Sequence, residues 1–293
     1  MDWKYIVEQI ENATRSAFQL INVRSVAGGD INSAYCLQGA EKSYFVKLNS
    51  AEKAFMFSAE SAGLVELSLT HTVRVPKPIV YGEFGTQAFL VLEFVKFGVS
   101  NKKSDRNFGR QLALLHQQCQ PYFGWHCDNT IGSTLQPNDR NEDWIAFWRS
   151  HRLQHQLALA SANGYQGILQ SKGEKLCDKL ESFFEGYIPQ PALLHGDLWG
   201  GNASVDKQGN PIMFDPACYY GDREADLAMT ELFGGFSQDF YAAYRETYPT
   251  EKGYMTRKKL YNLYHILNHL NLFGGGYLRQ AENIMGDLLS EVN

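Results

Sequence analysis

The hydrophobic pattern changes its period near residue 95, and this change constrains the fold more than any other feature of the chain. Up to that point, strand-like runs rich in β-branched and aromatic residues alternate with helical patterns at residues 2–18 and 52–69. The strand-like runs occupy residues 23–39, 42–49 and 74–95. Beyond it, helical spacing dominates, at residues 106–119, 142–160, 173–187 and 257–273. We therefore expect an α+β chain with two lobes, a β-rich N-lobe over residues 1–95 and a mainly helical C-lobe over residues 96–293.

The composition is that of an ordinary globular protein without excess positive charge. Of the 293 residues, 44% are hydrophobic, and the formal net charge is −5. Nucleic acid is therefore a poor candidate for a partner. The five cysteines form no CxxC pair, so neither a zinc site nor a disulfide framework is indicated. The chain shows no leader pattern and no apolar run near the roughly 20 residues of a membrane span. We expect a cytoplasmic protein with no membrane partner, and we favour a monomer.

The first third of the chain contains two candidate sites for binding a charged ligand, a pair of glycines and a lysine in a strand-like run. Gly28 and Gly29 lie between two strand-like runs, where paired glycines either form a hairpin turn or let backbone N–H groups approach a phosphate. Lys47 lies in a strand-like run with apolar neighbours on both sides. If it points inward it needs an anionic partner, because an unpaired buried ammonium is costly. Glu60 and Glu66, in the helix that follows, are both candidates, and the alternative is a solvent-facing lysine on an edge strand.

The densest cluster of polar residues is the stretch LLHGDLWGGN, residues 193–202. Two short strand-like runs follow it around a turn at residues 207–210, and a hairpin there would bring Asn202 close to Asp215. Amide and carboxylate oxygens suit Mg²⁺, which leaves Asp197 free to act as a base or to orient a nucleophilic hydroxyl. Taken singly, these residues could be turn caps. Taken together with Lys47 and the glycine pair, in this order, they indicate phosphoryl transfer, in which catalysis is mostly positioning and charge neutralisation.

The order of these motifs resembles the protein-kinase-like fold in its aminoglycoside phosphotransferase branch. The pattern HGD-x4-N alone indicates only this superfamily and no particular family within it. The longer stretch over residues 193–236, with residues 141–157 and the segment RVPKPIVYG at 74–82, is similar to the fructosamine kinase (ketosamine 3-kinase) family. The similarity extends from about residue 20 to residue 280.

The resemblance implies ATP and Mg²⁺ as cofactors and a role for each motif. Gly28 and Gly29 would cover the ATP phosphates, and Lys47 would hold the α and β phosphates with Glu60 orienting it. The adenine edge would meet the backbone of a hinge made of Leu92, Glu93, Phe94 and Val95. Asp197 would accept the proton of the sugar hydroxyl, Trp199 would help to form the sugar pocket, and Asn202 and Asp215 would bind Mg²⁺.

The acceptor implied by the family is a 1-deoxy-1-amino ketose, free or linked to a protein, phosphorylated at its 3-hydroxyl. The phosphorylated adduct breaks down and releases the amine, which makes the reaction a deglycation repair. Two other functions remain open. The chain could phosphorylate another small alcohol, such as an aminoglycoside or choline, or it could be an inactive nucleotide-binding scaffold.

The chain departs from the family pattern at two positions. Asp30 stands where some relatives carry a cysteine, so a redox switch in the glycine loop is not carried over. Asp222 stands where many relatives have histidine, and we expect it to tune the pocket. Among the neighbouring polar residues, we expect Glu224 and Asp226 to brace the catalytic loop or to begin a helix, and His195 to be a hydrogen-bonded scaffold residue.

Overall fold

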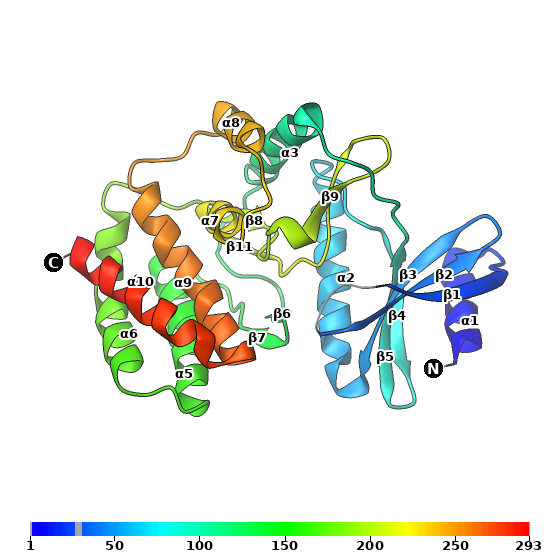
Figure 1. Ribbon diagram of the computed structural model, residues 1–293, viewed down its shortest axis with the longest axis horizontal. Helices are drawn as coiled ribbons and strands as arrows, with labels where there is room; N and C mark the ends of the chain where they lie inside the picture. The colour runs from blue at the N-terminus through cyan, green and yellow to red at the C-terminus, as the bar shows by residue number, and fades with distance from the viewer. Residues whose placement is uncertain (1, 27–30, 293) are drawn as a thin grey trace.

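The computed structural model describes residues 2–26 and 31–292 and has an antiparallel sheet at one end (Figure 1). The sheet has five strands in the order β1-β2-β3-β5-β4. Their bounds are β1 Leu20–Val26, β2 Ser33–Gly39, β3 Ser43–Ser50, β4 Pro78–Phe84 and β5 Gln87–Glu93. Two helices accompany it, α1 (Trp3–Thr14) and α2 (Ala54–Leu69), the latter preceded by the 3₁₀ turn η1 (Ala51–Lys53).

The alternation of side chains along β5 explains why α1 and α2 cover opposite faces of this sheet. Phe89 and Val91 pack in one cluster with Ile6 of α1. Leu90 and Leu92 point the other way and join the cluster that contains the buried residues of α2. Because both faces are covered, the strand reads as a continuous apolar run.

The remainder of the chain is mainly helical and lies on the other side of α2 (Figure 1). Its helices are α3 Lys102–Leu115, α4 Trp144–Phe147, η2 Trp148–Gln154, α5 His155–Ala162, α6 Ile168–Asp178, η3 Leu180–Phe184, η4 Gly200–Asn202, α7 Glu224–Leu232, α8 Gln238–Thr247, α9 Tyr254–Phe273, η5 Gly275–Tyr277 and α10 Leu278–Glu291. Short antiparallel pairs join β6 (Asn129–Ile131) to β7 (Thr134–Gln136), β8 (Ala192–Leu194) to β11 (Tyr219–Gly221), and β9 (Ala203–Val205) to β10 (Pro211–Met213).

The fold class is confirmed, since an antiparallel sheet precedes a mostly helical remainder. The helix expected over residues 142–160 forms with a π-helical segment, η2, in its middle. The helix expected over 173–187 begins earlier, at Ile168, and its last turns are 3₁₀. The sheet ends at Glu93, and the lobe boundary near residue 95 stays a prediction. No helix in the described part of the chain is long and apolar enough to cross a membrane.

The core of the helical part depends on close packing of aromatic rings and helices. Trp144, Phe147 and Trp148 are almost fully buried, as expected for an inter-helix cluster. Helix α3 lies close to α8 because Gly109 has no side chain, and a Cβ there would lie 2.1 Å from the carbonyl oxygen of Phe240. Trp148 also packs against Tyr261 and Tyr264 of α9, so this core holds a helix that lines the cavity described below.

Candidate active site

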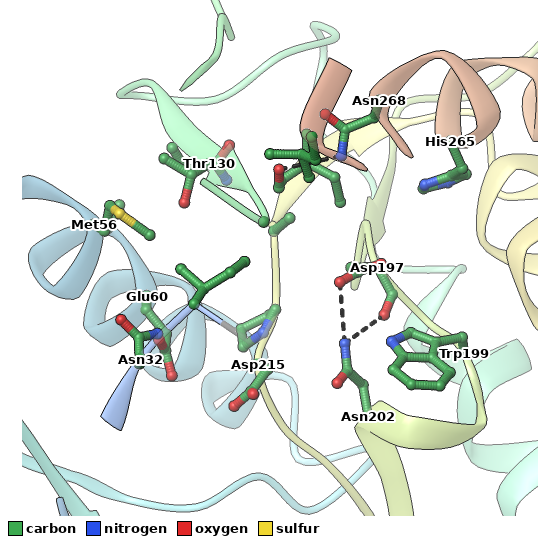
Figure 2. Close-up of a pocket in the computed structure, with 18 of the residues that line it drawn as sticks. Asn32, Met56, Glu60, Thr130, Asp197, Trp199, Asn202, Asp215, His265 and Asn268 are labelled. Atoms are coloured by element: carbon green, nitrogen blue, oxygen red, sulfur yellow. Dashed lines mark hydrogen bonds between the residues drawn. The ribbon is translucent and has the colours of Figure 1, made fainter. Parts of the chain in front are cut away.

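A cavity of about 640 Å³ lies between the sheet and the helical part, and residues distant in sequence line it. β2, β3 and α2 contribute one wall, and α7, α9 and the β6–β7 turn contribute the opposite wall. The loops before β9 and after β10 form the floor with Asp197, Asn202 and Asp215 (Figure 2). The cavity thus collects the polar residues that the sequence singled out.

Lys47 points into this cavity from β3, an interior strand of the sheet, and is only 5% exposed. Its Nζ lies 2.7 Å from Oε1 of Glu60 and 2.7 Å from Oδ1 of Asp215. Burial disfavours the charged form of Lys47, but the Asp215 and Glu60 carboxylates outweigh it and raise the pKa of the ammonium. The interpretation with Lys47 in solvent is therefore wrong, and of the two candidate partners the structure selects Glu60.

Glu66, the other candidate partner, is engaged elsewhere. It accepts hydrogen bonds from the Tyr220 hydroxyl, at 2.7 Å, and from the Trp125 indole. Glu60 itself is buried, and burial raises its pKa to about 6 although Lys47 acts in the opposite direction. The ammonium of Lys47 thus pairs with two carboxylates, that of Glu60 on the cavity wall and that of Asp215 on the floor.

The loop over residues 195–202, which carries Asp197 and is called the catalytic loop here, is held by Asp226 in the first turn of α7. Its carboxylate accepts the backbone N–H of His195 at 2.7 Å and that of Gly196 at 2.8 Å. The imidazole of His195 contacts the carbonyl of Phe214 at 3.0 Å, as expected for a scaffold residue. The expectation that Asp226 braces the loop is confirmed, and α7 does begin at Glu224.

Asp197 and Asn202 face each other across the loop that β8 delivers (Figure 2). The amide of Asn202 donates through Nδ2 to the carbonyl of Asp197 at 2.9 Å and to its Oδ2 at 3.1 Å. Burial, together with the nearby charge of Asp215, raises the pKa of Asp197 to about 7. A carboxylate in such a position can take up a proton near neutral pH.

The hairpin between Asn202 and Asp215 forms as the sequence predicts. Met213 pairs with Ala203, and the N–H of Phe214 donates to the carbonyl of Asn202 at 3.1 Å. Asp215 follows with a left-handed backbone and reaches Lys47. Asn202 and Asp215 therefore both face the cavity from the same end of one hairpin.

Trp199 lies beside these residues on the cavity wall and is 40% exposed (Figure 2). Its ring packs edge-on against Phe233, with centroids 6.3 Å apart. It also covers Gly201, where a Cβ would lie 2.2 Å from the indole. A large aromatic face is therefore presented next to Asp197.

Some residues expected to bind the nucleotide do not line the cavity or are not among the residues that the structure describes. Gly28, Gly29 and Asp30 fall outside the described residues. The expected hinge, Leu92–Val95, is absent from the cavity wall, and the side chain of Glu93 pairs with Arg74.

Asp222 does not line the cavity, because its buried carboxylate accepts hydrogen bonds from Tyr187 and Tyr261. An indirect influence of Asp222 on the pocket stays a prediction. The described residues contain no cluster of three potential histidine, cysteine or carboxylate metal ligands.

Sequence reasoning missed the wall that α9 contributes. His265, Asn268, His269 and Phe273 all line the cavity from this helix. Their spacing of three to four residues places them on one face, so the signal was present. It could not be interpreted, because nothing local distinguishes a face that meets a cavity from one that meets a core.

Comparison with known proteins identifies the family. The sequence model described as "Fructosamine kinase" matches residues 2–291 of the chain. The chain belongs to the fructosamine kinase family. A probable ketoamine kinase of Synechocystis sp. is 48% identical over 288 residues, which cover 98% of this chain and 97% of that protein. A chloroplastic protein-ribulosamine 3-kinase of Oryza sativa subsp. japonica is 42% identical over 93% of this chain and 80% of its own length.

Solved structures agree with this assignment. A provisionally named fructosamine-3-kinase from Haemophilus somnus 129PT superposes with a TM-score of 0.90 at 28% identity, covering 98% of this chain and 97% of that one. A thermostable aminoglycoside phosphotransferase in ternary complex with ADP and hygromycin B gives a TM-score of 0.64 at 12% identity, covering 98% and 97% of the two chains. This second likeness shows the protein-kinase-like fold alone.

Proposed function

We propose that the chain is an ATP-dependent kinase that phosphorylates the 3-hydroxyl of ketosamines, such as ribulosamine and fructosamine adducts, in deglycation. The observation that carries the proposal is the arrangement of Asp197, Asn202, Asp215 and Lys47 around one cavity in a chain of the fructosamine kinase family. The substrate would be a small ketosamine or one linked to a protein. The cytoplasmic location and the monomeric state stay predictions from the sequence.

The residues at the cavity floor fit a magnesium–nucleotide complex. The amide of Asn202 is fixed by its donation to Asp197, and no hydrogen bond among the described residues engages its Oδ1. Asp215 offers a carboxylate whose side chain is 42% exposed. Mg²⁺ is commonly bound by one or two such groups together with phosphates and water, and it supplies charge neutralisation at the transferred phosphoryl group. In this proposal Lys47, oriented by Glu60, holds the α and β phosphates.

Asp197 is the proposed base. A base must lie within reach of the proton that it accepts, and Asp197 lines the cavity beside Asn202. The bonds from Asn202 hold the carboxylate in place while leaving it on the cavity surface. Asp197 would orient the 3-hydroxyl toward the γ-phosphate and accept its proton. Trp199 would form part of the pocket that holds the sugar. Gly28, Gly29 and the backbone of Leu92–Val95 keep their proposed nucleotide roles.

The test is turnover by the Asp197→Asn variant with ribulosamine and fructosamine acceptors. We expect the rate to fall by about a thousandfold, since a positioned base contributes that order of rate enhancement, while ATP binding persists. The matched control is Asp139→Asn, because the side chain of Asp139 is 92% exposed and does not line the cavity. Retained turnover in the Asp197 variant would overturn the assignment. Aminoglycosides and choline in the same panel test the other small alcohols, and nucleotide binding without any product would indicate a scaffold.

A further inference from the structure

One side of the cavity carries five aromatic side chains that the proposed mechanism does not use as a set. Trp199, Phe233, His269, Phe273 and Tyr277 all line the cavity, and we call them the aromatic wall. Trp199, Phe233 and Phe273 are 40%, 43% and 55% exposed, although each would gain by burial. A cluster of solvent-exposed aromatic rings on a cavity wall indicates a ligand that covers the rings when it binds.

The rings form a continuous surface that begins at the reacting group. Trp199 is two residues from Asp197 and contacts Phe233, at the C-terminal end of α7. Phe233 lies 5.0 Å from the ring of His269, measured between centroids. His269 in turn lies 5.4 Å from Phe273 and 5.2 Å from Tyr277. The wall therefore leads outward from Asp197 along α9.

The charges around the cavity favour a cation on this wall. Lys47 is the one lysine or arginine among the described lining residues, and it is paired with Glu60 and Asp215. Asp197 adds a third carboxylate. The histidines of α9 add no positive charge, because burial lowers the pKa of His265 to about 3 and also lowers that of His269. Carboxylates and aromatic faces together attract an organic cation.

His269 adds a directed acceptor to the wall. Its Nδ1 lies 2.8 Å from the carbonyl oxygen of His265, which can only accept, so Nδ1 carries the proton. In the neutral ring, Nε2 then holds a lone pair and accepts a hydrogen bond. A ligand N–H group can meet this nitrogen while its charge rests against the neighbouring rings.

We propose that the aromatic wall recognises the protonated amine and alkyl stem of the ketosamine, with His269 Nε2 accepting an N–H of that amine. The assignment rests on the proposed function. The amine nitrogen is bonded to C1, two carbons from C3, so a 3-hydroxyl at Asp197 leaves the nitrogen and its alkyl stem to extend along the wall that begins at Trp199. Trp199 borders the sugar, and Phe233, His269 and Phe273 face the aminoalkyl group. The acceptor is thus selected by its positive charge as well as by its hydroxyls.

The test compares two acceptors of equal length, 1-deoxy-1-(hexylamino)fructose and its uncharged ether analogue, 1-O-hexylfructose. With the unmodified protein we expect the KM for the amine to be about tenfold lower and kcat to be similar. Phe233→Leu keeps an apolar side chain and removes the π face, and His269→Phe keeps a ring and removes the acceptor. Each variant should raise KM for the amine about fivefold, with kcat and the KM for the ether within about twofold.

The control variant is Phe55→Leu, because Phe55 is 46% exposed and lies outside the cavity wall. It should leave both acceptors unaffected. If Phe233→Leu fails to fold, Phe273→Leu carries the same test at a more exposed position. Equal KM values for the amine and the ether, or equal losses for both in the wall variants, would overturn the inference while leaving the kinase assignment intact. Failure of the unmodified protein to phosphorylate either acceptor would reject the proposed function and the inference with it.

Discussion

Two residues of the site, Gly196 and Asp215, have left-handed backbone conformations, with φ of 82° and 58°. Aspartate is among the residues that tolerate this region, and at Asp215 the conformation directs the carboxylate to Lys47. Gly196 has a second constraint, because a Cβ there would lie 2.0 Å from the carbonyl oxygen of Ala217. At the residue scale, the position of Asp197 therefore depends on the absence of one side chain beside it.

Replacing Gly196 by alanine should lower the free energy of unfolding by at least about 2 kcal/mol, because the φ penalty adds to a clash with backbone. Gly164→Ala is the matched control, since Gly164 has a φ of +90° but open space around it. The control should lose about 1 kcal/mol, from φ alone. Denaturant unfolding of both variants measures the difference, and equal losses would show that the contact with Ala217 is relieved without cost.

At the scale of elements, the packing of α7 against α9 positions both the brace of the catalytic loop and the cavity wall. A buried ion pair joins the two helices. The guanidinium of Arg257 donates from Nε to Oε2 of Glu224 at 2.7 Å and from Nη2 to Oε1 at 3.1 Å. The guanidinium also stacks 3.9 Å above the ring of Tyr187. Neither side chain of the pair has significant contact with water.

Arg257→Met should lower the free energy of unfolding by about 3 kcal/mol, because it leaves Glu224 buried without its counter-charge. The double variant Arg257→Met with Glu224→Gln should recover part of this loss, since the remaining group is then neutral. Thermal or denaturant unfolding of the single and double variants measures both effects. A single-variant loss below about 1 kcal/mol would mean that water or a neighbouring group already compensates Glu224.

The sequence predicted the elements that have strong local patterns. The strands of the sheet, α1, α2 and the β9–β10 hairpin follow from periodicity and turn residues. The π-helical segment at Trp148–Gln154 has no such pattern, because seven residues between two α-helical segments are too few to show a period of their own. Strands of three residues, such as β6, are too short to show alternation. Their pairing depends on the tertiary contacts around them.

In the candidate site, too, the residues joined by local structure were predicted, and those brought together by helix packing were not. Asp197, Asn202 and Asp215 were predicted together, because one hairpin joins them and their residue types are unusual in a turn. The contributions of His265 and Phe233 were not predicted, because the two residues reach the cavity only when α7 and α9 pack against each other. The partner of Lys47 could be narrowed to two residues from sequence, and the orientation of α2 decided between them.

For the whole molecule, protonation and folding are linked through histidines buried in their neutral form. His265 is 4% exposed, and burial lowers its pKa to about 3. Its neighbours act in both directions, since His269 and Arg152 lower the pKa while Asp226 raises it. The folded chain therefore binds fewer protons at this position than the unfolded chain between pH 3 and about 6.5, so the contribution of His265 to stability rises with pH in that window.

The stability advantage of the unmodified protein over His265→Gln should therefore shrink by about 1 kcal/mol between pH 7 and pH 5.5. Glu60 and Glu224 titrate in the same range, with pKa values raised to about 6 and about 7, and both are present in each protein, so the difference isolates His265. Denaturant unfolding at several pH values measures it. A pH-independent difference at position 265 would mean that the imidazole binds a proton as readily in the folded chain as in the unfolded chain, which contradicts the lowered pKa.

The two backbone bonds from Asp226 to His195 and Gly196 have a consequence for how such a protein diversifies. The shape of the loop that carries Asp197 is specified from a helix thirty residues away and through two main-chain N–H groups, which every residue except proline supplies, although position 196 also requires glycine. Neither bond involves the side chain of Trp199, which lies at the cavity surface. Substitutions at the cavity surface can therefore change which acceptor fits while these two bonds keep Asp197 in place. The specificity of such a protein can then change without any change in the proposed chemistry.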